Sequence, residues 1–254
     1  MNKNIFISAF VVMILQSCAS KKDVLYFQDA EAHSVENIIY NSSKIQPNDI
    51  LSIVVGASVP ETTYPYNVQS SAAGVNLNLD VLQLQGYLVS NEGFIDFPVL
   101  GKIKVLGETI DDLEIALQKR LEKGGHLIDP TVSVRILNAK VTVLGEVKVP
   151  GTYTFTEQNI SLPQALGYAG DLTINGERKD ILIIREESGV RNIARIDLTT
   201  ADWFGSPYYY IKPNDVIVVN PNNPKVKSAG FIGNAGTVLT IASLILTSVV
   251  LITR

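Results

Sequence analysis

Short runs of β-branched residues, each bounded by turn-forming residues, recur through the middle of this 254-residue chain. The first run begins at Ile50, directly after Pro47-Asn48-Asp49, where proline presets a turn and asparagine tolerates a left-handed backbone. The same phrase returns as Pro213-Asn214-Asp215 before Val216, which predicts two related turn-then-strand units. Further strands are predicted at residues 86–89, 94–97, 131–137, 152–155, 181–185, 194–198 and 216–219.

Two helices are expected among these strands. The first has Thr109 as its N-cap and ends at Gly124-Gly125, and three leucines share one of its faces: Leu113, Leu117 and Leu121. The second, shorter helix follows Ser161, whose side chain can form a capping box with Gln164. Many short strands with a few helices predict an α+β fold.

The N-terminus has the layout of a secretory signal, with one basic residue, Lys3, followed by an apolar run up to Leu15. The segment Leu15-Gln16-Ser17-Cys18 resembles a bacterial lipobox, and Cys18 is the single cysteine of the chain. We therefore expect residues 1–17 to be removed and Cys18 to be acylated, which would attach the chain to a lipid bilayer. The alternative is that Cys18 is an ordinary small residue beside the anchor.

Residues 231–253 form a run without a charged residue near the C-terminus. A helix of that length spans about 35 Å, slightly more than the roughly 30 Å hydrocarbon core of a bilayer, so a C-terminal transmembrane helix is expected. It would begin at Phe231 and end at Thr253, with hydroxyl side chains on one half of its circumference: Thr237, Thr240, Thr247 and Ser248. That stripe either faces other subunits or a lumen, or belongs to an isolated anchor.

The charge balance argues against a nucleic-acid partner. The formal net charge is −4 at pH 7, and no basic stretch is longer than Lys21-Lys22. Binding to nucleic-acid phosphates needs clustered lysine and arginine side chains that displace counterions. We therefore expect no nucleic-acid partner.

Residues suited to catalysis or metal binding are sparse. His33 and His126 are the only histidines, and neither has a second metal ligand at a suitable spacing. Asp111-Asp112 lies where a helix is expected to begin and Glu186-Glu187 where a hairpin is expected to turn, so neither carboxylate pair predicts a catalytic site. The sequence also lacks a Gly-x-Ser-x-Gly elbow and a phosphate-binding loop. We expect no catalytic residue, no metal and no cofactor.

One aromatic group is a candidate for binding sugar rings by stacking. Its members follow one another closely in the chain: Trp203, Phe204, Tyr208, Tyr209 and Tyr210. The alternative is that these side chains pack at an interface or between domains.

Several phrases together resemble the polysaccharide export family, the lipoprotein channels for capsule and exopolysaccharide. The phrases are residues 86–101, the helix from Ile110 and residues 129–134 for the export domain, and residues 143–147, 150–153, 165–166 and 169–170 for the soluble-ligand-binding β-grasp domain. The resemblance covers roughly residues 45–220. Only one β-grasp module is evident in it.

With the two ends, this resemblance implies a periplasmic α+β chain with one export domain, one β-grasp module and a C-terminal transmembrane helix. Residues 221–230 are expected to be a linker, because Asn220-Pro221-Asn222-Asn223-Pro224 suits neither a strand nor the start of a regular helix. The expected divisions are a signal peptide at 1–17, a lipidated tether at 18–44, an export domain at 45–138, a β-grasp domain at 139–220, the linker at 221–230 and the helix at 231–253.

The resemblance also implies a function that is not enzymatic. Identical subunits would form a ring around a channel that carries capsular or extracellular polysaccharide across the outer membrane, docked on an inner-membrane co-polymerase or chain-length regulator. The alternative is a lipid-anchored envelope scaffold, or a glycan-binding module, that forms no pore. An envelope glycan hydrolase would need two carboxylates that meet across a cleft.

Overall fold

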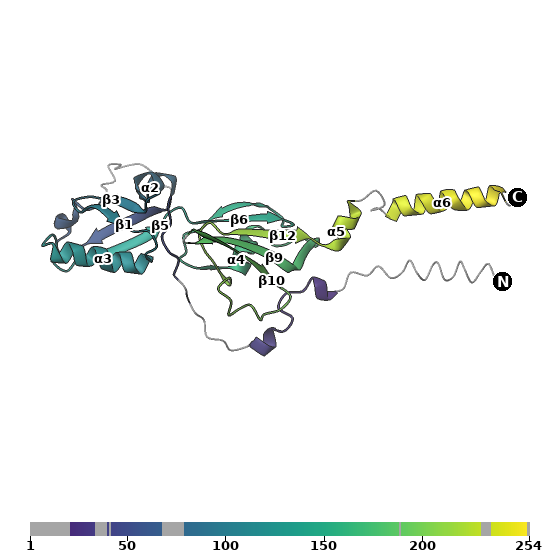
Figure 1. Cartoon of the computed structure of the whole chain (residues 1–254), viewed down its shortest axis with the longest axis horizontal. Coiled ribbons are helices and arrows are strands. Elements are labelled where there is room, and N and C mark those ends of the chain that lie inside the picture. The colour runs from purple at the N-terminus through teal and green to yellow at the C-terminus, as the bar shows by residue number, and fades with distance from the viewer. Residues whose placement is uncertain are drawn as a thin grey trace.

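The computed structural model describes residues 21–33, 40, 42–67, 79–187, 189–229 and 235–252. The predicted signal peptide, Cys18, Phe231 and Thr253 lie outside these residues. Two domains, which we call the first domain (residues 42–137) and the second domain (residues 139–221), lie in a row along the long axis of the molecule, and two helices follow at one end (Figure 1).

The first domain is a three-stranded antiparallel sheet with a helix packed against it. The order of its strands is β2-β1-β5, and α3 contacts β5. A separate hairpin of β3 and β4 lies beside this sheet. The elements are β1 (Ile50–Gly56), η3 (Pro60–Thr63), α2 (Leu79–Gln85), β2 (Tyr87–Leu88), β3 (Phe94–Phe97), β4 (Gly101–Lys104), α3 (Ile110–Lys123) and β5 (Thr131–Ile136).

Helix α3 begins and ends where the sequence predicts. The Thr109 hydroxyl accepts a hydrogen bond from the Asp112 amide at 3.1 Å, and Gly124 is the C-cap residue. The leucines of the predicted face are all fully buried: Leu113, Leu117 and Leu121. The local capping signals and the apolar spacing of this helix are confirmed.

The second domain is a five-stranded sheet of order β10-β9-β12-β6-β7, crossed on one face by α4. Strand β12 is parallel to β6, whereas the other neighbours are antiparallel. The predicted capping box of Ser161 and Gln164 starts α4. The elements are β6 (Lys140–Gly145), β7 (Gly151–Thr154), β8 (Ile160–Ser161), α4 (Leu162–Tyr168), β9 (Gly176–Glu187), β10 (Val190–Ile196), β11 (Tyr210–Ile211) and β12 (Val216–Pro221).

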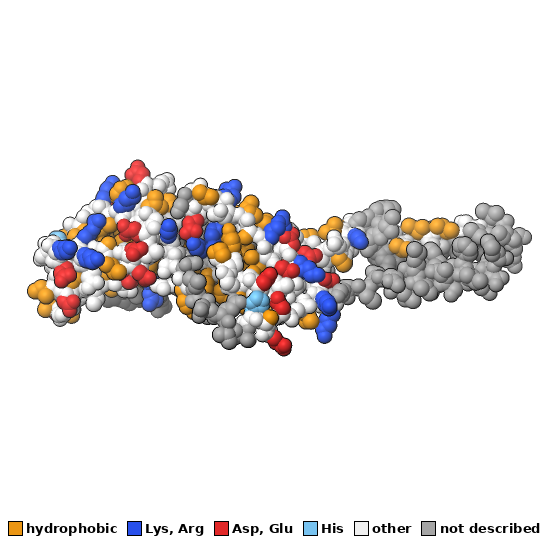
Figure 2. Space-filling view, turned by 60° about the horizontal axis from the view of Figure 1, so that its bottom comes forward, with side chains coloured by type: hydrophobic (Ala, Val, Ile, Leu, Met, Phe, Trp, Pro, Cys, Tyr) orange, Lys and Arg blue, Asp and Glu red, His pale blue; other side chains and the backbone are white. Residues whose placement is uncertain are grey.

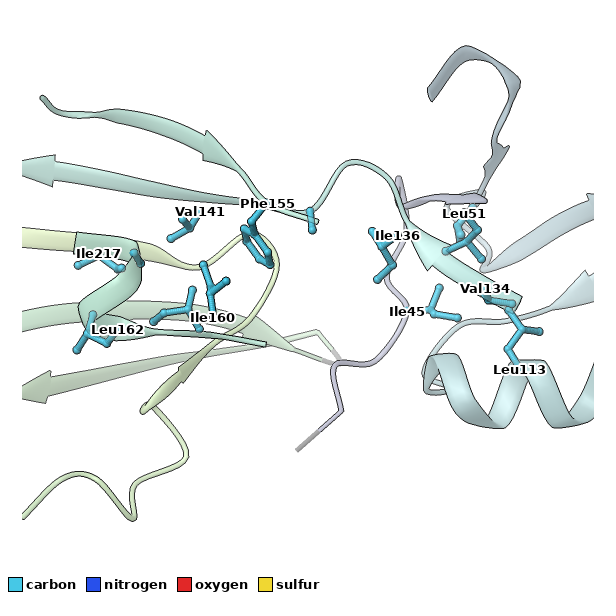
Figure 3. Packing of buried hydrophobic residues seen from close by; sticks show 14 of the residues in the cluster. Ile45, Leu51, Leu113, Val134, Ile136, Val141, Phe155, Ile160, Leu162 and Ile217 are labelled. Atoms are coloured by element: carbon cyan, nitrogen blue, oxygen red, sulfur yellow. The ribbon is translucent and has the colours of Figure 1, made fainter. Parts of the chain in front are cut away.

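The buried apolar residues of the two domains belong to one cluster. Buried side chains form two groups on either side of the connection between β5 and β6, as Figure 3 shows. In the first domain the labelled residues are Ile45, Leu51, Leu113, Val134 and Ile136, and in the second they are Val141, Phe155, Ile160, Leu162 and Ile217. Hydrogen bonds join the domains as well, because the Gln46 side chain donates to the Glu186 carbonyl at 3.2 Å.

The described part of the chain does not contain the predicted transmembrane helix. The C-terminal helix α6 (Ala235–Ile252) has 18 residues, which span about 27 Å at 1.5 Å per residue and fall short of a roughly 30 Å hydrocarbon core. Within the part of the chain that is described, no helix has both the length and the apolar character needed to cross a membrane. The expectation of a spanning helix over residues 231–253 is therefore wrong.

The hydroxyl residues of α6 bond to their own helix. Thr240, Thr247 and Ser248 each donate a hydrogen bond of 2.8 Å to a carbonyl four residues earlier. Thr237 lies one turn before Thr240 on the same helix. These bonds keep the three hydroxyls engaged within α6.

A short helix, α5 (Asn223–Ser228), occupies part of the stretch predicted as a linker. The Asn222 side chain caps it by accepting a hydrogen bond from the Lys225 amide at 3.1 Å. Pro224 stands in the first turn, where its missing N–H removes no hydrogen bond from the helix. The asparagines and prolines therefore start a helix here.

The two Pro-Asn-Asp phrases form the same turn, as the sequence predicts. Asn48 and Asn214 both have a φ of 69°, in the left-handed region. The Asp49 carboxylate accepts a hydrogen bond from the Gln46 amide at 2.8 Å, and the Asp215 carboxylate accepts one from the Lys212 amide at 2.9 Å. Each turn then leads directly into a strand, β1 or β12.

The two aspartates differ in their electrostatic surroundings. Both are buried, but Asp215 forms an ion pair with Arg185, whose Nη2 lies 2.7 Å from Oδ2. Among the described residues, no cation lies within ion-pair distance of Asp49. Burial therefore raises the pKa of Asp49 to about 6.

We expect Asp49→Asn to remove a pH-dependent loss of stability. Because the pKa of Asp49 is higher in the folded than in the unfolded chain, the folded chain binds more protons between about pH 4 and pH 6, and the free energy of unfolding decreases as pH rises through that range. Asparagine keeps an acceptor for the Gln46 amide, so the variant should gain about 1–3 kcal/mol at pH 7. Urea unfolding between pH 4 and pH 7 measures this.

The matched control is Asp215→Asn in the equivalent turn. It leaves the buried Arg185 without its carboxylate and should lower the free energy of unfolding at pH 7 by about 3 kcal/mol. Identical pH profiles for the wild type and Asp49→Asn would contradict this assignment.

Candidate subunit interface

The sheet of the second domain has two different faces. Side chains alternate along each strand, and one set is fully buried: Val141, Val143, Ile181, Ile183, Ile217 and Val219. Helix α4 packs on that side, since its Leu162, Ala165 and Leu166 are buried in the same core. The alternate positions face the other way and include polar residues, such as Thr142 beside Val216 and Arg195 beside Leu182, but six of them are aliphatic: Leu144, Leu182, Ile184, Ile193, Val216 and Val218. We call this set the open face.

Strand register brings the residues of the open face together. Val218 of β12 is paired with Leu144 of β6 on one side and Leu182 of β9 on the other. In the next row, Val216 is paired with Ile184, which is paired in turn with Ile193 of β10. Directly opposed side chains on one face are about 5 Å apart, so the six side chains form one continuous patch.

The patch is most exposed at its two sides. Leu144 keeps 43% of its surface accessible and Ile193 keeps 62%. The residues between them are partly exposed, although they lie in central strands. A contiguous aliphatic surface on a folded domain marks a site of interaction with another molecule.

Charged pairs border the open face. Arg195 forms an ion pair with Asp180, whose second oxygen accepts a hydrogen bond from the Asn220 side chain at 3.3 Å. At the other end of β10, Arg191 pairs with Glu186 at 2.6 Å. An apolar centre with a polar border is the usual composition of a protein–protein interface.

A polar cavity of about 320 Å³ lies between the two domains. Carboxylates of both domains line it, namely Asp111 and Glu114 from α3 and Glu157 from the segment after β7. Glu114 is engaged, because its Oε1 accepts a hydrogen bond from the Val134 amide at 2.7 Å. The sequence does not predict that these carboxylates lie close together, because their proximity depends on the contact between the two domains.

The predicted aromatic group is packed inward at its start. Trp203 is buried, its indole N–H donates to the Thr200 carbonyl at 2.9 Å, and its ring contacts Phe204 and Tyr209 at centroid distances of 5.3 and 5.6 Å. The rings of Tyr208 and Tyr210 also contact other side chains. The Arg185 guanidinium lies 4.8 Å from the centre of the Tyr208 ring, and the Tyr40 ring lies 5.2 Å from the Tyr210 ring. Their contacts are with other parts of this chain.

The segment before residue 30 joins this aromatic group, which the sequence did not predict. The Phe27 ring lies 5.3 Å from Phe204, and its amide donates to the Leu198 carbonyl at 3.0 Å. The Tyr26 hydroxyl donates to Asp171 at 2.6 Å. This part of the predicted tether is held on the second domain, and the apolar phrase Val24-Leu25-Tyr26-Phe27 was the signal for it.

The histidines and the paired carboxylates lie at helix and hairpin ends or contact other side chains of this chain. The His126 ring lies 6.0 Å from Tyr66, and His33 lies 3.9 Å from Asp29. Asp111 and Asp112 are in the first turn of α3. Glu186 and Glu187 are at the tip of the β9–β10 hairpin, where Glu187 pairs with Lys212 at 2.9 Å. No three potential metal ligands meet in the portion of the chain covered by the structure.

Comparisons with known proteins match both domains. The family model described as "Polysaccharide biosynthesis/export protein" matches residues 40–137, and the SLBB domain model matches residues 140–194. The EPS I polysaccharide export outer membrane protein EpsA of Ralstonia solanacearum is 29% identical over 203 residues, 77% of this chain and 52% of that protein. The protein of the same name from Ralstonia nicotianae is 34% identical over 148 residues, 56% of this chain and 38% of that protein.

The chain thus spans about half the length, or less, of the curated relatives it matches. The order of the two matched domains agrees with the resemblance noted from the sequence. The chain belongs to the polysaccharide export family, which is not a family of enzymes.

Proposed function

We propose that this protein is the outer-membrane part of a channel that exports capsular or extracellular polysaccharide, built as a ring of identical copies. The observation that carries the proposal is the open face. Six aliphatic side chains on a sheet face, bordered by ion pairs, are suited to a neighbouring copy of the chain. A hydrated polymer needs a wide path, and a chain of two small domains can enclose one only as several copies.

The ring requires that the open face contact a different surface of the next copy. Such a head-to-tail contact repeats around an axis and closes into a ring, whereas two open faces packed on each other would give a closed dimer. The mass of the assembly distinguishes these arrangements.

The relatives' names support the location and the cargo. Both are named as outer-membrane proteins for export of an extracellular polysaccharide. We propose the same cellular location for this chain, with acylation of Cys18 as its attachment and a periplasmic body. The first domain, which lies at the end far from η1 (Lys21–Asp23), would then face an inner-membrane co-polymerase or chain-length regulator (Figure 1).

The second candidate function is a lipid-anchored glycan-binding module that forms no pore. The polar cavity between the domains favours it, since carboxylate and amide side chains there could accept and donate hydrogen bonds to sugar hydroxyls. This candidate predicts a monomer, so the assembly state separates it from the channel.

Glutamate at the edge of the open face should prevent assembly. Ile193→Glu and Leu144→Glu each place a charge in the proposed contact, where burial without a counter-charge is costly. Both positions are already exposed in one copy, so the fold should be unaffected. We expect the wild type to form a ring in mild detergent by analytical ultracentrifugation, and the variants to sediment as single copies and to export less than a tenth of the polysaccharide.

The matched control is Ile128→Glu, since Ile128 is an isoleucine of the first domain with 87% exposure and lies outside the open face. It should assemble and export normally. Assembly of Ile193→Glu and Leu144→Glu into the wild-type ring would overturn the role of the open face.

Acylation of Cys18 should be visible in the mass of the mature N-terminus. We expect a diacylated or triacylated cysteine as the first residue, because the lipobox-like segment directs cleavage before Cys18. Ala19-Ser20 follows instead of an aspartate, which by resemblance to enteric sorting favours the outer membrane. Cys18→Ala should abolish the added mass, and an intact Met1 on the purified wild type would refute the assignment.

A further inference from the structure

Helices η1 and α5 lie at the same end of the second domain. Helix η1 is tied to β9 by the ion pair of Asp23 and Lys179 at 2.6 Å. Helix α5 is tied to the loop before β9, because the Asn222 side chain donates to the Ile174 carbonyl at 3.2 Å. In Figure 1 this end points away from the first domain.

The surface at this end combines aliphatic and basic side chains. Its exposed aliphatic residues come from three segments, and lysines stand beside two of them: Val149 with Lys148, Val226 with Lys225 and Lys227, and Ile174. We call these six residues the basic tip. Ile174 keeps 69% of its surface exposed and Val226 keeps 57%. Helix α5 contains no acidic residue.

The composition of the basic tip differs from that of the surface elsewhere. On the face drawn in Figure 2, acidic and basic side chains are interspersed over both domains. Of the carboxylates near the basic tip, Asp23 forms an ion pair with Lys179, whereas Asp171 accepts a hydrogen bond from the Tyr26 hydroxyl and Glu146 accepts one from the Thr173 hydroxyl at 2.8 Å. Helix α5 and residues 148–150 contribute three exposed lysines and no acidic residue to this surface.

Exposed aliphatic side chains surrounded by lysines suit the headgroup region of a phospholipid bilayer. The aliphatic groups can enter the boundary with the acyl chains, while each lysine near an anionic surface contributes about 1 kcal/mol. A protein partner would need a complementary acidic surface, whereas the bilayer lies close by if Cys18 is acylated.

Chain length brings the basic tip near the membrane. Cys18 is separated from Lys21 by three peptide steps, which can span at most about 11 Å. From there the chain is fixed to the second domain through Tyr26 and Phe27, and the Arg178 guanidinium lies 5.2 Å from the Tyr26 ring. An acyl chain on Cys18 would thus hold this end of the domain within a short distance of the headgroups.

We propose that the basic tip is a binding surface for anionic phospholipid headgroups, which holds the second domain against the membrane with the first domain pointing away. This inference rests on the proposed acylation for its location, but it assigns the contact to different residues. Acyl chains on Cys18 fix the point at which the chain is attached but not the orientation of the domain, so a second contact with the bilayer would fix its direction.

One added cysteine in each variant tests this contact in the full chain, in which an acylated Cys18 has no free thiol to react with the dye. Ile174→Cys and Val226→Cys place a thiol at the basic tip, and Ile128→Cys places one on an equally exposed isoleucine of the first domain. Each variant is labelled with an environment-sensitive maleimide dye and reconstituted in vesicles of phosphatidylcholine and phosphatidylglycerol that contain a nitroxide-labelled lipid. We expect quenching at positions 174 and 226 to exceed that at position 128 severalfold.

The lysines are tested in the same samples. Replacing Lys148, Lys225 and Lys227 by glutamine should reduce quenching at position 174 at least twofold, and so should added salt or the removal of phosphatidylglycerol. Equal quenching at positions 174 and 128 would overturn the proposal, and so would quenching that ignores both salt and the glutamine replacements. The mass of each sample reports acylation separately, and assembly is not needed for the readout, so failure of the channel proposal would be seen independently.

Discussion

Strand β12 lies between β6, to which it is parallel, and β9, to which it is antiparallel, and the second domain depends on this position. A strand from the end of the chain thereby completes a sheet whose other strands come before it. The close approach to β6 requires glycine at position 145, where φ is 89° and a Cβ would lie 2.0 Å from the Val219 carbonyl oxygen. Without β12, the sheet would separate into two hairpins.

The consequences of this pairing reach both faces of the sheet. Inward, Ile217 and Val219 complete the core against α4, and outward, Val216 and Val218 form the middle of the open face. The turn that starts β12 is held by Asp215, which binds Arg185, and Arg185 in turn donates to the carbonyls of Pro207 and Tyr210. One buried ion pair thus connects the central strand to the aromatic group and, through it, to the segment around Phe27.

Local signals in the sequence were sufficient for much of the fold. The caps at Thr109 and Ser161, the paired turns and most strands follow from side-chain chemistry within a few residues. The open face was not predicted, because the run Val216–Val219 is aliphatic throughout and does not tell which side is covered. The length of the C-terminal helix was overestimated, since the absence of charges does not fix where a helix begins or ends. The cavity between the domains depends on contacts between distant residues, which no local pattern reveals, and the apolar phrase around Phe27 does not tell which part of the chain it contacts.

Copies of this chain are proposed to close into a ring through the open face. Electron cryomicroscopy of the assembly extracted in mild detergent tests it most directly. We expect closed rings with a central opening, in which the Val218 row of each copy contacts a different surface of its neighbour. Particles of one or two copies, or rings with the open face turned to solvent, would contradict it.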